Sequence, residues 1–143
     1  MSSPSFYFDE ESGQSLCIIR TKTKTYIGSA TCLEADRDMM SEKVGCEIAY
    51  HRAAINSLID YRDTLKAELS GLKKYYYSVC QSKHFDKNSY MARMLKRQIY
   101  MREDDIKTAQ KLILDEKNQL KQYLEDKTKL YKKIRSYRKA ESK

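Results

Sequence analysis

Apolar side chains recur at alternating intervals of three and four residues through most of this chain. This heptad spacing places them along one side of an α-helix, in a seam that faces a partner helix. The pattern predicts one helix over about 38–79, a polar break at 80–88, and a second helix over about 89–138. The first seam comprises Val44, Ile48, Ile55, Leu58, Leu65, Leu69, Leu72 and Tyr76. The second comprises Leu95, Ile99, Ile106, Ala109, Ile113, Leu120, Tyr123, Leu130 and Ile134.

Before about residue 36 the pattern changes to short runs of aliphatic, aromatic and β-branched residues, which is typical of strands. Residues 16–19 and 25–27 are the clearest strands, and turns are predicted at 11–14, where Gly13 can take a positive φ, and at 21–24. Two or three short antiparallel strands are marginal alone in water, so this sheet must pack on a helix or on a second chain.

The predicted fold class is therefore α+β and predominantly α. A small β element at 1–35, a hairpin or meander, packs on a long antiparallel coiled-coil hairpin at 36–143, and together they form one structural domain. Asp36 or Ser41 can cap the first helix, and Asp86, Asn88 or Ser89 the second.

The short break implies that the two helices are antiparallel neighbours, which fixes an approximate register between their seams. Polar residues that interrupt one seam then face opposite charges on the other helix. The predicted pairs are His51 with Glu116, Arg62 with Asp104 or Asp105, and Lys127 with Asp38 or Glu42.

Further apolar side chains flank the seams where two helices cannot cover them. These are Met94, Met101, Leu112, Leu124 and Tyr131. Since exposed apolar flanks favour association, we expect a dimer or higher homo-oligomer.

The composition argues against a membrane protein, a secreted protein and a metal-binding protein. No apolar run approaches the roughly 20 residues of a membrane span, and the N-terminus lacks a signal-peptide pattern. We therefore expect no membrane association and a cytoplasmic protein. The four cysteines are widely spaced and the only histidines are His51 and His84, which favours buried reduced thiols over a zinc site or a disulfide. We predict no metal and no cofactor.

The net charge of +8 is concentrated in two segments. Residues 73–102 carry eight basic side chains against one acidic side chain, Asp86, and residues 127–143 carry eight against Glu141. The remainder of the chain is net acidic, so acidic partners are expected at these two places.

Catalytic chemistry has weak support, and we predict that the protein is not an enzyme. His51, beside Glu116, is the best acid–base candidate, but a hairpin offers little concavity, and a seam histidine held by a carboxylate explains the pair. The acidic run 103–105 points in different directions around a helix, which disfavours a shared metal.

The segment around the break is the best candidate binding surface. Its basic and aromatic side chains could contact nucleic acid, contact a protein, or be only solvated. Tyr76 is assigned to packing, and the candidate tip residues are Lys73, Lys74, Tyr75, Tyr77, Lys83, His84, Lys96 and Arg97. The C-terminal basic end, which could equally be a solvated helix end, contributes Lys132, Lys133, Arg135, Arg138 and Lys139.

Three segments, 39–53 (MMSEKVGCEIAYHRA), 72–90 (LKKYYYSVCQSKHFDKNSY) and 94–99 (MLKRQI), resemble small accessory proteins of phages and prophages of Gram-positive bacteria. The resemblance implies a phage accessory or anti-defence protein that binds a host protein or ribonucleoprotein in the host cytoplasm, here through its basic and aromatic ends. Direct DNA or RNA binding is the first alternative, and a structural coiled-coil or virion component is the second.

Overall fold

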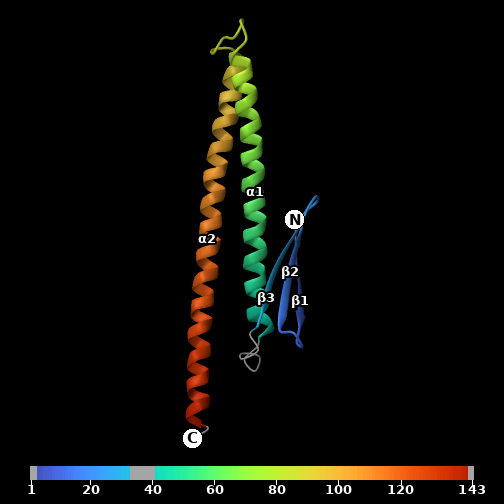
Figure 1. The fold of residues 1–143 in the computed structure, drawn as a ribbon, viewed down its shortest axis with the longest axis vertical. Coiled ribbons are helices and arrows are strands. Elements are labelled where there is room, and N and C mark those ends of the chain that lie inside the picture. Colours follow the sequence, from blue (N-terminus) through green and yellow to red (C-terminus); the bar gives the residue numbers. More distant parts are fainter. Residues whose placement is uncertain (1–2, 33–40, 142–143) are drawn as a thin grey trace. The chain divides into compact units, whose positions relative to one another are not determined.

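The computed structural model describes residues 3–32 and 41–141. A three-stranded antiparallel sheet, formed by β1 (Pro4–Asp9), β2 (Gln14–Arg20) and β3 (Thr25–Thr31), precedes two long packed helices, α1 (Glu42–Cys80) and α2 (Tyr90–Glu141) (Figure 1). The predicted fold class, a short N-terminal antiparallel sheet followed by a helical hairpin, is confirmed.

The sheet is a meander with strand order β1-β2-β3. Cys17 in the central strand pairs with Phe6 on one side and Gly28 on the other. Both turns lie where the sequence predicted them. Gly13, with φ of 70°, makes the first turn, and its N–H donates to the Asp9 carbonyl at 2.9 Å. In the second turn the Thr21 N–H donates to the Lys24 carbonyl at 2.8 Å.

Serine side chains cap both helices. The Ser41 hydroxyl accepts the Val44 N–H at 3.4 Å, and the Ser89 hydroxyl accepts the Ala92 N–H at 3.2 Å. Each satisfies a backbone donor that has no partner within the helix. Ser41 and Ser89 were two of the predicted caps, whereas Asp36 lies outside the described residues. The second helix continues to Glu141, slightly beyond the predicted end near 138.

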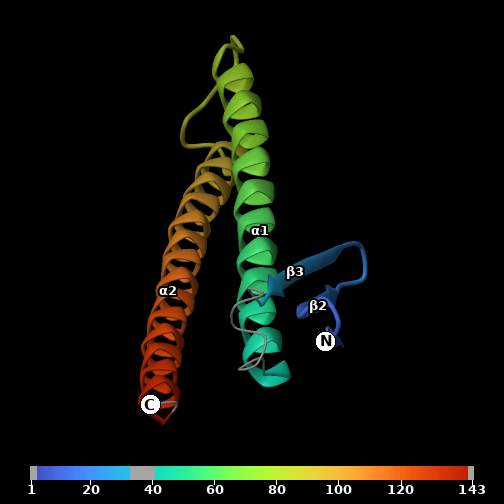
Figure 2. The same ribbon diagram turned by 60° about the horizontal axis from the view of Figure 1, so that its bottom comes forward.

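Contacts within the chain gather in two compact units. We call Met1–Ser57 with Leu114–Lys143 the sheet unit, and Leu58–Ile113 the tip unit. The sheet unit contains the strands, the first part of α1 and the second part of α2. The tip unit contains the end of α1, the connection 81–89 and the start of α2 (Figures 1 and 2).

Small side chains hold the sheet against α1 in the sheet unit. Cys17, Ala49 and Ala53 are completely buried and form one core cluster, with Ile19 packed on it. A Cβ atom at Gly28 would overlap the Ala49 carbonyl oxygen and the Ala53 nitrogen, so the β3 backbone lies directly on the helix backbone. A Cβ at Gly45 would similarly overlap the Ser15 hydroxyl. The stripe of Gly45, Ala49 and Ala53, one residue every helical turn, is therefore a second packing face of α1.

The predicted seam accounts for most of the remaining buried side chains. Ile55 and Ile113 are buried within their units, and Leu65, Ile106 and Ala109 form the core cluster of the tip unit with Leu69 against it. Leu130 is the exception, because 44% of its surface is exposed although its spacing assigns it to the seam. The heptad spacing continues through Leu130, but the described residues leave much of that side chain uncovered.

The predicted polar pairs have three different outcomes. His51 Nδ1 lies 2.5 Å from Glu116 Oε1, as predicted. Arg62 instead pairs with Asp63, its neighbour on α1, at 3.2 Å, because an adjacent carboxylate competes with one on the facing helix. Lys127 has its ammonium group 5.4 Å from the centre of the Tyr123 ring, a cation–π contact, while Asp38 lies outside the described residues.

Candidate functional site

The residues predicted at the tip are all exposed, and two of them are engaged within the tip unit. Tyr75 and Tyr77 have 54% and 69% of their surfaces exposed. Lys73 forms an ion pair with Glu103 at 3.4 Å. Since both groups of this pair are about half exposed, water screens them, and Lys73 keeps much of its positive field toward solvent. The exposed fractions of Lys74, Lys83, His84 and Arg97 are likewise high enough for contact with a partner.

An aromatic cluster orders the connection between the helices. The Tyr76 ring is half-buried and meets the Phe85 ring edge-on, with centroids 6.2 Å apart. Lys96 Nζ lies 6.0 Å from the centre of the Tyr76 ring. Phe85 thus anchors the connection to α1, and Tyr76 packs as the sequence predicted. Lys96 therefore stabilises the position of the Tyr76 ring and also adds positive charge to the tip.

A second group of tip residues escaped the sequence prediction. Tyr90, Arg93, Arg97 and Tyr100 follow each other at intervals of three, four and three, which places them on one face of α2. We call them the α2 stripe. Its tyrosines are 72% and 69% exposed, and both arginines are exposed. Only Arg97 was predicted as a contact. The others could have been found by applying the helical period to the polar face as well as to the seam.

The C-terminal basic end is a solvated part of α2. Lys132, Lys133, Arg135, Arg138 and Lys139 are all exposed. Arg138 and Lys139 lie in the last turn of the helix, where positive charge complements the helix dipole. Lys132 also borders a shallow groove on α2 beside Leu120 and Leu124. This end combines charge with some apolar surface, but the predicted contacts there include no tyrosine, unlike the α2 stripe.

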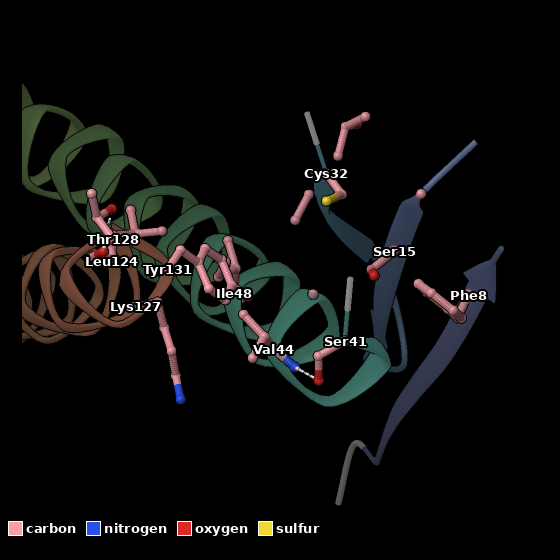
Figure 3. A pocket seen from close by; sticks show the side chains of 14 residues that line it. Phe8, Ser15, Cys32, Ser41, Val44, Ile48, Leu124, Lys127, Thr128 and Tyr131 are labelled. Atoms are coloured by element: carbon pink, nitrogen blue, oxygen red, sulfur yellow. Dashed lines mark hydrogen bonds between the residues drawn. The ribbon is translucent and has the colours of Figure 1, made fainter. Parts of the chain in front are cut away.

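The sheet unit also contains a cavity of about 190 Å³. Phe8 and Ser15 from the sheet, Val44 and Ile48 from α1, and Leu124, Thr128 and Tyr131 from α2 surround it (Figure 3). Leu124 and Tyr131, expected as uncovered flanks, therefore face the sheet and α1 within one chain. Cys32 and Ser41 also line the cavity.

Three titratable groups of the sheet unit have raised pKa values, which favour their protonated forms. Burial, followed by the charge of Glu47 and a hydrogen bond to it, raises the pKa of Tyr123 to about 12. Burial also raises the pKa of the Cys17 and Cys46 thiols. Because a nucleophilic cysteine needs a lowered pKa, neither thiol has the environment of a catalytic nucleophile.

His51 fits a packing role. Its ring contacts the rings of Tyr50 and Tyr123, with centroid distances of 6.0 and 6.3 Å, and the Glu116 carboxylate fixes one ring nitrogen. The side chains of the pair are 15% and 20% exposed. Such a pair favours one helix register, because a shifted register would leave a partly desolvated group without its partner.

A double-mutant cycle tests this pairing. We expect His51→Ala and Glu116→Ala each to destabilise the protein, and the double variant to be more stable than additivity predicts by about 0.5–1 kcal/mol. Urea unfolding followed by circular dichroism measures the coupling at neutral and mildly acidic pH. Strict additivity at both pH values would show that the pair contributes no coupling to the register.

Among the residues that the structure describes, no three His, Cys, Asp or Glu side chains gather as metal ligands would. Within the same residues, neither helix has a stretch apolar and long enough to cross a bilayer. Comparisons with protein-family models, with curated proteins and with solved structures found nothing that matches this chain.

Proposed function

We propose that this chain is a non-enzymatic interaction protein, of the phage accessory or anti-defence kind, that binds a host protein or ribonucleoprotein through its tip unit. The α2 stripe is the observation that carries the proposal. On one helix face, two exposed arginines stand between two exposed tyrosines. Tyrosine and arginine are, with tryptophan, the residue types enriched among those that dominate the energy of protein interfaces.

The charge of the tip favours an acidic partner. In residues 73–102, eight basic side chains stand against Asp86, and the ion pairs of Lys73 with Glu103 and Arg102 with Glu68 neutralise two of them locally. Arg93 and Arg97 are exposed, and a rigid helix presents them. A partner that places carboxylates or phosphates opposite these two groups gains directional, charge-assisted hydrogen bonds.

Direct binding of DNA or RNA is the second candidate function. Exposed tyrosine rings beside arginines can stack on unpaired bases while the guanidinium groups contact phosphates. Tyr90 and Tyr100 supply such rings. Nucleic-acid binding of this kind would weaken steeply with salt, because each phosphate contact releases counterions.

Charge reversal on the α2 stripe tests the leading proposal. We expect Arg93→Glu with Arg97→Glu to reduce the amount of partner captured from a Gram-positive bacterial lysate by at least about tenfold, because two attractive contacts become repulsive. Lys107→Glu with Lys111→Glu is the matched control. It makes the same charge change at exposed positions of α2 outside the stripe and should leave capture nearly unchanged.

Two further measurements separate the candidates. Capture that persists after nuclease treatment supports a protein partner, and capture lost on nuclease treatment supports the nucleic-acid alternative. Fluorescence anisotropy with single-stranded RNA and DNA over a range of salt concentrations measures direct binding. Equal capture by the stripe variant and the control variant would show that the α2 stripe does not bind the partner.

A further inference from the structure

The two edges of the sheet differ in how their backbone is covered. At β3, two side chains of α1 cap the outer edge. Arg52 Nη1 donates to the Ser29 carbonyl at 2.6 Å, and Asn56 Nδ2 donates to the Ile27 carbonyl at 3.0 Å. β1 forms the opposite edge and pairs only with β2 among the described strands. An uncovered edge strand is a template for pairing with another strand.

The capping of β3 identifies which backbone groups of β1 point outward. In an antiparallel ladder, alternate residues direct both N–H and C=O to the same neighbour. Since Ile27 and Ser29 direct their carbonyls away from β2, the residues opposite them, Ile18 and Leu16, bond to β1 instead. Their partners in β1 are Ser5 and Tyr7. Phe6 and Phe8 therefore direct their N–H and C=O groups to the open edge.

The outward-bonding positions of β1 carry no charge that would oppose pairing. They are Pro4, Phe6 and Phe8. Pro4 has no N–H and blunts the start of the edge, but Phe6 and Phe8 lack the lysine or bulge that commonly protects natural edge strands. Phe6 is 46% exposed, and its ring lies 6.5 Å from the Tyr50 ring of α1. Phe6 and Tyr50 line a groove beside the edge together with Pro4 and Cys46, and Lys43 and Glu47 complete it.

We propose that a second copy of this chain pairs with β1 at this edge, antiparallel and two-fold symmetric about Tyr7. In this register Phe6 faces Phe8 of the second copy, and Phe8 faces its Phe6. Four N–H···O bonds then form, because both residues direct a donor and an acceptor outward. Tyr7 meets Tyr7 of the second copy across the junction, an aromatic cross-strand pair of the kind that stabilises antiparallel sheets.

Self-complementarity selects a second copy over an unrelated peptide. The Phe-x-Phe sequence places matching aromatic side chains on the groove side of both copies, as a two-fold interface requires. The register also sets Asp9 opposite Ser5, so the acidic residues 9–11 of the two copies lie at opposite ends of the junction.

Local charge also permits this contact. Residues 3–32 carry three acidic and three basic side chains, so the sheet is the neutral part of a chain whose net charge is +8. Association through the sheet brings together the segments that repel least. The contact uses only residues of the sheet unit, so this dimer does not depend on the function proposed for the tip unit.

Sedimentation velocity of the full chain over a wide concentration range tests the proposal. We expect a monomer–dimer equilibrium in the wild type and a shift of at least about tenfold toward monomer in Phe6→Lys. That variant places a charge on the edge beside the groove. Thr25→Lys adds the same charge at the exposed start of β3 and should leave the dimer intact. A wild type that stays monomeric at all concentrations, or a dimer that persists in folded Phe6→Lys, overturns the proposal.

Amide hydrogen exchange of the wild-type protein gives a second measurement that does not depend on a variant. The amides of Ser5 and Tyr7 bond to β2 and should be protected at every concentration. The amides of Phe6 and Phe8 should become protected only as the dimer forms. If a dimer forms while those two amides exchange as fast as in the monomer, its interface lies elsewhere, and the proposal is overturned.

Discussion

Replacing Gly28 with alanine is expected to destabilise the sheet unit by about 3 kcal/mol, at the high end for overpacking of a well-packed core. The added Cβ would overlap the Ala49 carbonyl oxygen and the Ala53 nitrogen. These are backbone atoms of a helix and cannot rotate away as a flexible side chain would. The sheet must then move off α1, which opens the fully buried cluster of Cys17, Ala49 and Ala53.

Chemical unfolding followed by circular dichroism, with hydrogen exchange in β2, measures this effect. Gly71→Ala is the matched control, because it makes the same substitution within α1 where a Cβ would meet nothing within 4 Å. It should stabilise the protein by about 0.5–1 kcal/mol, since alanine loses less backbone entropy than glycine in a helix. Similar stabilities for the two variants would show that the close approach at Gly28 does not hold the sheet.

Leu65→Ala is expected to destabilise the tip unit by about 2–4 kcal/mol, through lost burial and the cavity left behind. Leu65 is 6% exposed and packs in one cluster with Ile106, Ala109 and Leu69. We expect the amides of α1 and α2 around this cluster to exchange faster, and the α2 stripe to lose affinity for the partner proposed for it as its helix frays.

Leu112→Ala is the control for this truncation. Leu112 belongs to the same unit and is 46% exposed, so removing its side chain should cost less than about 1 kcal/mol. Urea unfolding of both variants, with hydrogen exchange to locate the loss, provides the comparison. Equal losses for Leu65 and Leu112 would contradict the assignment of Leu65 to the core of the tip unit.

The periodicity of apolar residues was sufficient to predict the helices, the strands and many of the buried seam residues. The alternation of threes and fours identified Leu65 and Ile106 as buried, and β-branched runs with Gly13 at a turn located the strands. The antiparallel register was specific enough to bring His51 to Glu116, because short connections restrict how two helices can align. These features depend on local spacing, which a sequence states directly.

The packing of the sheet on α1 was not predictable in the same way. Gly45 lies outside the predicted seam, yet it belongs to the small-residue face of Gly45, Ala49 and Ala53. Glycine and alanine carry little hydrophobic signal, so periodicity gives them no weight. Their significance arises only when a second element approaches closely enough to need the missing side chains.

Some electrostatic features could be predicted from the sequence, and others could not. Total charge and the basic character of residues 73–102 follow from the sequence alone. The choice of Asp63 over Asp104 or Asp105 by Arg62, and of Tyr123 by Lys127, depends on side-chain positions within a few ångströms. The distribution of charge therefore predicted a basic candidate binding surface. Which groups form ion pairs was decided by competition among side chains that lie close together in the fold.

By itself the sequence determined a short sheet, two seam-forming helices, their antiparallel order and a basic, aromatic connection between them. Only the tertiary structure decided which face of the sheet lies on α1, how exposed the α2 stripe is, and which sheet edge has no neighbour among the described residues. The physical reason is the distance along the chain over which each kind of interaction acts. Helix and strand periods act between residues close in sequence, whereas backbone contact, edge capping and exposure depend on segments that meet only after folding.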